Sequence, residues 1–458
     1  MDLIFKNLFF VGRNDFAEDK RMVYEVHHRQ ISWVYFAIMV IGLWLIVTPF
    51  TFGYTGDALI YNDILLGIAI IILSYLSLKP YNLWAQWIIV FIGLWFFVVP
   101  IIFWAAQPVI YLNQTLIAIL LTTLGIIIPD QPGIKLFEQE GNNVPPGWSY
   151  NPSSWSERIP VITFAWIGFF VAQYMGAYQL GYIEEVWDPV FGEGTSKVLT
   201  SDISKAFPVP DASLGAFAYI MDVLMGYVGG THRWRTMPWV VIIFGILIIP
   251  LGVVSITLII LQPIAVGYWC SLCLVSAVIS LAMIPFTIDE VLATIQLIKY
   301  EKKNGKPFWR TFWFGGTMPG GSMEETYDPE IILQNTGKSL ITDFINKPWN
   351  LFLSFALGIY IIASPAVFNY SDALAYSHFI SGALIATFAV IAMSEVARTL
   401  RFINILFGIW IITSPWILGY DNDVTLINSV IAGIILIILT FPKGKVEDER
   451  GRIDKYIF

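Results

Sequence analysis

Apolar stretches of about twenty residues recur along the whole 458-residue chain, and no other feature constrains its fold as strongly. About 20 apolar residues in a helix span the roughly 30 Å hydrocarbon core of a bilayer. Hydrophobic residues make up 57% of the chain and charged residues 13%, which excludes an ordinary soluble domain. We therefore predict an all-α polytopic membrane protein with about twelve transmembrane helices. The expected spans are 31–48, 59–77, 84–101, 110–128, 160–180, 212–229, 238–261, 264–287, 349–365, 374–394, 402–418 and 425–441.

The distribution of lysine and arginine predicts how these spans are oriented. With a cytoplasmic N-terminus and twelve spans, 24 of the 26 basic residues fall on the cytoplasmic side, and only Lys197 and Lys205 fall outside. Both termini are then cytoplasmic in a multi-pass protein of the plasma membrane. The connection around Gln262 and Pro263 is exoplasmic, and Cys270 is expected about two helical turns below the outer surface.

Four copies of one motif divide the chain into repeats. The copies read G-L-W-L-I-V-T-P, G-L-W-F-F-V-V-P, G-I-Y-I-I-A-S-P and G-I-W-I-I-T-S-P, and they close at Pro49, Pro100, Pro365 and Pro415. Thirteen residues after these prolines stand Asn62, Asn113, His378 and Asn428, respectively. The repeat is therefore a helical hairpin of about 50 residues, in which proline ends or kinks the first helix. Two hairpins precede the middle of the chain and two follow it.

The string T-S-P-W-I-L-G-Y at 413–420 resembles the SPW repeat of small membrane proteins, and the other copies are looser versions of it. The resemblance covers the first four and the last four spans. It implies a hairpin fold and no established chemistry. Its glycines and aromatic residues are interpreted either as helix contacts and interfacial anchors or as the walls of a groove for a lipid or quinone.

The chain contains two cysteines, Cys270 and Cys273, in the string W-C-S-L-C inside an apolar segment. This spacing places both thiols on one helical turn, where they can form an easily reduced disulfide, and a helix N-terminus beside them would stabilise a thiolate. The pair therefore predicts redox chemistry. With four histidines and no further cysteine, no metal-ligand spacing is present, and no metal site is predicted.

The middle of the chain resembles the vitamin K epoxide reductase family. The strings K-V-L-T-S at 197–201, P-D-A-S-L-G-A-F-A-Y at 210–219 and W-C-S-L-C-L-V-S-A at 269–277 follow the family's order and spacing. The resemblance covers about 130 residues and implies a four-helix bundle. The predicted organisation is a cytoplasmic segment 1–30, two repeats 31–130, a cytoplasmic linker 131–155, the bundle 156–292, a cytoplasmic connector 293–347, two repeats 348–442 and a cytoplasmic tail 443–458.

This resemblance implies a quinone-coupled thiol oxidase. An exoplasmic thiol would reduce the disulfide, with Cys270 as the exchange thiol and Cys273 facing the quinone, and the dithiol would then reduce menaquinone, ubiquinone or a similar quinone. The residues expected to bind the quinone are Ser201, Asp211, Tyr219 and Trp269. Trp269 is interpreted either as a stacking partner of the quinone or as an interfacial anchor.

Two departures from the family pattern affect this prediction. The second cysteine pair, which family members carry in the outer loop, is missing, and Thr195 or Ser196 replaces the cysteine before K-V-L-T-S. A thioredoxin-like exoplasmic protein could attack Cys270 directly, a separate subunit could supply the relay cysteines, or turnover could be lost. Asp211 replaces the family's asparagine, and its carboxyl group can donate a hydrogen bond to a quinone only when protonated.

Asp222 lies in the middle of the sixth predicted span. It is interpreted either as a carrier of protons for quinone reduction or as a hydrogen-bonding group between helices. The leading hypothesis is a membrane thiol-disulfide oxidoreductase. The alternative is a non-catalytic scaffold or accessory subunit of a larger membrane complex with a vestigial cysteine pair. Lipids are expected partners, whereas the net charge of −8 gives no reason to expect nucleic acid.

Overall fold

The fold is helical throughout the part of the chain that the computed structural model describes. The described residues are 28, 32–79, 82–103, 107–127, 142–206, 209–322, 348–420, 422–444 and 449–450. No β-strand forms within these ranges, and eleven of their helices are long and apolar enough to cross a membrane. The sixth predicted span corresponds to a further helix of 17 residues, α10 (Asp211–Tyr227). The prediction of an all-α polytopic membrane protein is confirmed.

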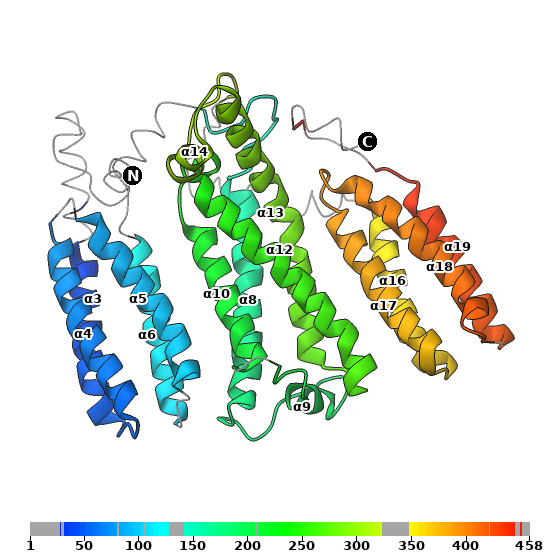
Figure 1. Cartoon of the computed structure of the whole chain (residues 1–458), viewed down its shortest axis with the longest axis horizontal. Coiled ribbons are helices and arrows are strands. Elements are labelled where there is room, and N and C mark those ends of the chain that lie inside the picture. The colour runs from blue at the N-terminus through cyan, green and yellow to red at the C-terminus, as the bar shows by residue number, and fades with distance from the viewer. Residues whose placement is uncertain are drawn as a thin grey trace. The chain divides into compact units, whose positions relative to one another are not determined.

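Two helical hairpins form the N-terminal repeat pair, drawn in blue and cyan in Figure 1. Their helices are α3 (Ser32–Thr51), α4 (Asp57–Ser77), α5 (Leu83–Ile102) and α6 (Pro108–Ile127). Within the first hairpin the backbones meet at Gly42 and Gly67. A Cβ atom on Gly42 would lie 2.8 Å from the Gly67 carbonyl oxygen, so only glycine permits this approach.

Two further hairpins form the C-terminal repeat pair, drawn in yellow to red in Figure 1. Their helices are α16 (Trp349–Phe368), α17 (Asp372–Ile391), α18 (Ile403–Ile417) and α19 (Asp423–Thr440), with the 3₁₀ turn η3 (Arg398–Phe402) before α18. Apolar side chains from all four helices form a shared core that includes Ile361, Ile385, Ile411 and Leu436.

The motif aromatics join the two hairpins of each pair by reciprocal hydrogen bonds. In the N-terminal pair, Trp44 Nε1 donates to Asn113 Oδ1 and Trp95 Nε1 donates to Asn62 Oδ1, both at 2.9 Å. In the C-terminal pair, the Tyr360 hydroxyl donates to Asn428 Oδ1 at 2.5 Å, and Trp410 Nε1 donates to Ser377 Oγ at 2.8 Å. The aromatic residue of each motif copy therefore binds the partner hairpin, which gives the repeated sequence pattern a structural reason.

This pairing corrects the spacing inferred for the third repeat. Ser377, and not His378, accepts the hydrogen bond that Asn62 accepts in the first repeat. Gly42 meets Gly67, 25 residues later, whereas Gly358 meets Gly382, 24 residues later. The third hairpin is one residue shorter between these contacts. Thirteen residues after Pro365 stands His378, but the residue that corresponds to Asn62 is Ser377.

The middle of the chain folds into α8 (Trp155–Gln179), α10, α12 (Pro238–Leu261) and α13 (Ser271–Lys303). Helix α8 packs against α10, while Gly245 and Gly252 of α12 contact Val291 and Ile284 of α13, respectively. Figure 1 shows these helices side by side. The shorter helices are α9 (Gly194–Leu199), α11 (Arg233–Thr236) and α14 (Phe308–Phe314).

The start of α13 differs from the eighth predicted span. Helix α12 continues into a π-helical turn, η2 (Gln262–Val266), and the chain then reverses at Gly267, whose φ is 77°. Helix α13 begins only at Ser271, seven residues after the predicted start. The predicted start of the eighth span at 264 is therefore wrong, and Cys270 is the residue immediately before the first turn of α13.

Candidate active site

Cys270 and Cys273 form a disulfide at the N-terminal end of α13. The backbone amide of Cys273 donates to Cys270 Sγ at 3.1 Å, so the first turn of the helix presents an N–H group to this sulfur. The Gln262 side chain accepts from the Cys270 amide at 3.0 Å and thereby holds the residue that precedes α13 in place. Amide donors at a helix N-terminus favour a thiolate when the disulfide opens.

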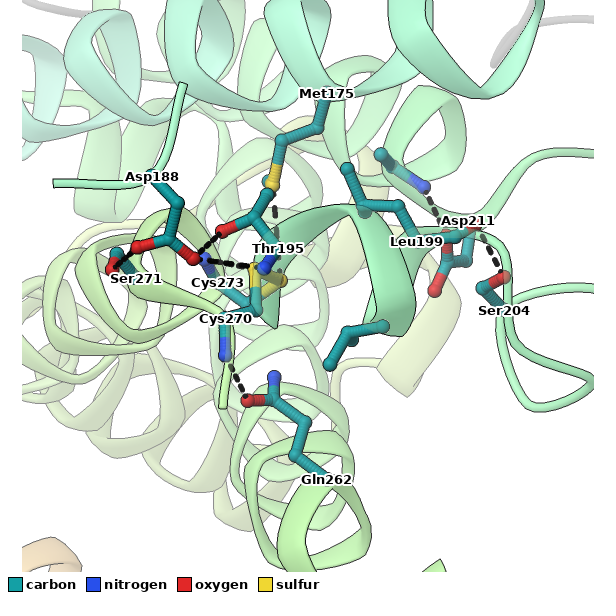
Figure 2. Close-up of a disulfide and its surroundings, with 12 residues drawn as sticks. Met175, Asp188, Thr195, Leu199, Ser204, Asp211, Gln262, Cys270, Ser271 and Cys273 are labelled. Atoms are coloured by element: carbon teal, nitrogen blue, oxygen red, sulfur yellow. Dashed lines mark hydrogen bonds between the residues drawn. A yellow bond between two sulfur atoms is a disulfide. The ribbon is translucent and has the colours of Figure 1, made fainter. Parts of the chain in front are cut away.

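Asp188 lies in the loop that joins α8 to α10, which is expected to face outward and is called the outer loop, and it connects this loop to the helix that carries the cysteines. Its carboxylate accepts from the Phe191 amide at 2.8 Å and from both the amide and the hydroxyl of Thr195, at 2.8 and 2.7 Å. It also accepts from the hydroxyl of Ser271, which lies between the two cysteines in the sequence. Figure 2 shows Asp188, Thr195 and Ser271 grouped beside the disulfide.

The carboxyl group of Asp188 is ionised at neutral pH. Burial raises the pKa of Asp188, but the hydrogen bonds from Ser271, Phe191, Thr195 and Val190 together hold it well below its usual range. A depressed pKa contributes stability that is complete above the pKa of an unfolded aspartate and is lost only as the pH falls through the depressed value. The connection between the loop and α13 is therefore intact at neutral pH.

The outer loop covers Cys270, whose side chain is 0% exposed. Cys270 packs with Met175, Val198 and Leu199. Gly194 lies so close to Trp269 that a Cβ atom would be 2.0 Å from the Trp269 carbonyl oxygen. Cys270 is therefore closed to solvent beneath this loop.

Cys273 faces a cavity of about 380 Å³ inside the bundle. The walls are mostly apolar side chains of α10 and α12, such as Leu214, Leu251 and Leu258. Small-molecule pockets typically have volumes of about 300–1,000 Å³ and a few polar groups among apolar ones. The polar residues that line this cavity are Ser201, Ser204, Asp211, Tyr219, Ser255, Gln262 and Ser276.

The comparisons with known families match this architecture. The model of the vitamin K epoxide reductase family matches residues 159–288, and that of the SPW repeat domain matches residues 32–128 and 348–441. The central bundle is a vitamin K epoxide reductase family domain. SPW repeat domains flank it on both sides in the sequence. No curated protein and no solved structure matches the chain.

In the vitamin K epoxide reductase domain, three of the four residues expected to bind a quinone line the cavity together with Cys273: Ser201, Asp211 and Tyr219. Asp211 Oδ1 accepts from Gln179 Nε2 at 2.6 Å, which ties the start of α10 to the end of α8. The Tyr219 hydroxyl lies 2.8 Å from Ser276 Oγ and 2.7 Å from Ser280 Oγ, so α13 holds the phenol in place.

Two predicted residues of the vitamin K epoxide reductase domain lie away from the cavity walls. Trp269 is not among the lining residues, and its ring packs beside Phe191 of the outer loop with centroids 6.5 Å apart. Asp222 lies three residues after Tyr219 on α10 and is 0% exposed. Neither of its carboxylate oxygens has a hydrogen-bond partner among the described residues.

Several contributors to the vitamin K epoxide reductase domain site were not predicted. Gln179 and Gln262 hold Asp211 and Cys270, and Met175 Sδ lies 3.8 Å from Cys273 Sγ. The only sequence indication was that each glutamine is a polar residue at the end of an apolar stretch. Among the described residues, no group of three or more His, Cys, Asp and Glu side chains could hold a metal ion.

Replacing Asp188 with asparagine is expected to accelerate reduction of the disulfide by a small dithiol. Hydrogen bonds to a charged group are worth about 1.5–3 kcal/mol, which corresponds to a roughly ten- to hundredfold faster reaction if the loop must open first. Mass-tag alkylation of thiols released over time measures this rate. Glu193→Gln is the matched control, because Glu193 forms an exposed pair with Lys197. Equal reduction rates in Asp188→Asn and wild type would show that the contact between Asp188 and Ser271 does not limit access of the dithiol to the disulfide.

Proposed function

We propose that the vitamin K epoxide reductase domain oxidises exoplasmic thiols through Cys270 and Cys273 and passes the electrons to a quinone. Membership of the central domain in this family supports thiol redox chemistry in a membrane. The observation that carries the finer proposal is that Cys273 belongs both to the disulfide and to the wall of the cavity. The two cysteines thereby lie on different routes of access, one beneath the outer loop and one beside the cavity.

The thiol half of the reaction takes place at Cys270. A partner thiolate attacks Cys270 Sγ, the bond to Cys273 breaks, and Cys273 leaves as a thiolate. A second partner thiol then attacks the mixed disulfide, so the partner is oxidised to its disulfide and both cysteines are reduced. The N–H groups at the start of α13 stabilise the negative charge that develops on sulfur.

The second half of the reaction returns Cys270 and Cys273 to the disulfide and releases two electrons and two protons. A bound quinone supplies the acceptor for them. The cavity fits such a group, because its walls are apolar and its volume is that of a small-molecule site. Asp211, Tyr219 and Ser201 orient the acceptor, and Asp222, buried one turn after Tyr219, exchanges protons with the site.

The expected site of thiol oxidation is the exoplasmic side of the plasma membrane, with both termini in the cytoplasm. Because the chain has no other cysteine, the electron donor is a thioredoxin-like protein or a separate cysteine-bearing subunit. Labelling of Glu193→Cys in intact cells with a membrane-impermeant maleimide tests the orientation. Labelling only after permeabilisation would place this loop in the cytoplasm and contradict the proposal.

The decisive experiment follows the thiol state of the purified full chain. The reduced protein is mixed with a short-chain quinone, and its free thiols are tagged at intervals. We expect the disulfide to return within minutes and quinol to appear in equal amount, while Cys273→Ala forms no disulfide and no quinol. In Asp222→Asn we expect reoxidation to slow by about tenfold. A group that transfers a proton directly to the reacting atoms usually contributes about 10²–10⁴-fold, and Asp222 does not line the cavity, so a smaller effect is expected. An unchanged rate would assign Asp222 a structural role.

A scaffold function is the second candidate, and the burial of Cys270 favours it. Cys270 is 0% exposed beneath a loop that has no cysteine of its own. In that case the disulfide is structural and the protein serves as an accessory subunit of a larger membrane complex. A reduced pair that quinone does not reoxidise, in a protein that remains folded, would support this function and contradict the oxidase.

A further inference from the structure

The two repeat pairs place one ionisable residue at the same structural position. The reciprocal hydrogen bonds align Asn62, Asn113, Ser377 and Asn428. The residues that follow them are therefore also equivalent, and they are Asp63, Gln114, His378 and Ser429. In each pair the first hairpin carries the ionisable group and the second carries a neutral one.

In the N-terminal pair, Asp63 is 0% exposed within α4. Gln114 Nε2, from the other hairpin, donates to both carboxylate oxygens at 3.0 and 3.1 Å, and Asn62 Nδ2 donates to Oδ1 at 3.0 Å. Tyr54, in the connection between α3 and α4, lies next to the carboxyl group. Gln114 Oε1 is buried and has no hydrogen-bond partner among the described residues.

In the C-terminal pair, His378 is 0% exposed within α17. Its Nδ1 lies 2.5 Å from the Tyr370 hydroxyl and 3.3 Å from Ser364 Oγ, and these two hydroxyl oxygens are 2.5 Å apart. Tyr54 and Tyr370 both stand five residues after the motif proline, so the tyrosine is part of the repeat. His378 Nε2 and Ser429 Oγ are buried without a partner among the described residues.

Neither ionisable group is paired with a group of opposite charge among the described residues. Tyr54 is the titratable residue beside Asp63, and Tyr370, with Tyr360 and Tyr420 nearby, is beside His378. Within the described ranges, no lysine, arginine or second carboxylate interacts with either group. An isolated charge inside a bilayer costs several kcal/mol, so such groups are rarely placed there without a function.

We propose that each repeat pair contains a buried proton-binding site, formed around Asp63 in the N-terminal pair and around His378 in the C-terminal pair. The ligand is a proton. In each site a carboxyl or imidazole group takes it up, and hydroxyl or amide groups of the same pair accommodate both protonation states by reorienting their hydrogen bonds. This inference is independent of the redox function, because it concerns the repeat domains alone.

Infrared difference spectroscopy on the full chain tests the Asp63 site. Between acidic and alkaline buffer we expect a carbonyl band of a protonated carboxyl group that is present in the wild type and missing in Asp63→Asn, since the other carboxyl groups, Asp222 among them, contribute equally to both spectra. The double variant Asp63→Gln with Gln114→Asp moves the acid to the equivalent position of the other hairpin and should restore the band. A structural hydrogen bond would not titrate, so a wild-type spectrum without this band, or one that Asp63→Asn leaves unchanged, overturns the proposal for this pair.

Nitrogen NMR of protein with labelled histidine tests the His378 site. The chain has four histidines, so His378→Gln identifies the resonance of His378 by its loss. We expect this resonance to change from neutral to protonated imidazole as the pH is lowered, and we expect Tyr370→Phe to shift the midpoint. A His378 resonance that stays neutral over the whole pH range in which the protein is folded overturns the proposal for this pair. Melting curves of all variants exclude unfolding as the cause.

Discussion

Replacing Glu290 with glutamine is expected to lower the free energy of unfolding of the central domain by about 3–5 kcal/mol, because it leaves a buried charge without its counterion. Glu290 forms a two-point ion pair with Arg233, at 2.5 Å for each hydrogen bond, and both side chains are almost fully buried. Arg158, also buried, donates to the carbonyl oxygens of Gly226 and Val228, which Arg233 contacts as well. Glu290 is therefore the counterion of Arg233, and its loss leaves this buried guanidinium group uncompensated.

The temperature at which the protein unfolds in detergent measures this effect. Glu193→Gln is the control, because exposed pairs such as Glu193 and Lys197 contribute only about 0–1 kcal/mol. The double variant Arg233→Met with Glu290→Leu removes both charges and should be more stable than Glu290→Gln, since an apolar replacement of a buried pair is often tolerated. A melting temperature of Glu290→Gln equal to that of the control would refute the assignment of this pair as a structural anchor.

Replacing Gly215 with leucine is expected to slow oxidation of the cysteine pair by quinone while leaving its reduction by thiols intact. Gly215 lines the cavity, and a Cβ atom there would meet only the Ala172 Cβ, at 3.9 Å. The larger side chain therefore projects into open space rather than into a neighbouring helix. Displacing a ligand or straining the walls costs about 1–3 kcal/mol, which predicts a roughly ten- to hundredfold slower return of the disulfide.

Two measurements separate this effect from general damage to the fold. The rate of disulfide reduction by a dithiol should be unchanged in Gly215→Leu, because the proposed route to Cys270 passes beneath the outer loop and not through the cavity. Gly215→Ala adds one methyl group to the same position and should retain most of the quinone-driven rate. If Gly215→Leu reoxidises as fast as wild type, the cavity is not the route by which electrons leave Cys273.

The sequence was sufficient to predict the helices, the hairpins and the pairing of the two cysteines, because these depend on long apolar stretches and on residues close together in the chain. It was not sufficient to predict the start of α13. The apolar segment continues through the reversal at Gly267, so hydropathy alone gives no boundary there. The one-residue shortening of the third hairpin was equally hidden, since it becomes visible only when Trp410 is seen to bind Ser377.

The site was predictable where a resemblance supplied the residue and unpredictable where tertiary contacts define it. Of the four residues expected to bind a quinone, Ser201, Asp211 and Tyr219 line the cavity, whereas the ring of Trp269 packs beside Phe191. No role for Asp188 was predicted. Its contact with Ser271 bridges 83 residues and depends on the fold of the loop, which no local pattern encodes.

Because two hairpins are fused in one polypeptide, each repeat pair can contain a single ionisable residue in its interior. In a symmetric dimer of separate, identical hairpins, every residue would recur at both equivalent positions, so an acid would face a second acid across the axis. Like charges at close range oppose ionisation, and the two groups would titrate as one coupled unit. Tandem duplication removes that symmetry, because each copy can then mutate independently. Asp63 beside Gln114, and His378 at the position equivalent to Ser429, are the products expected of such divergence after duplication.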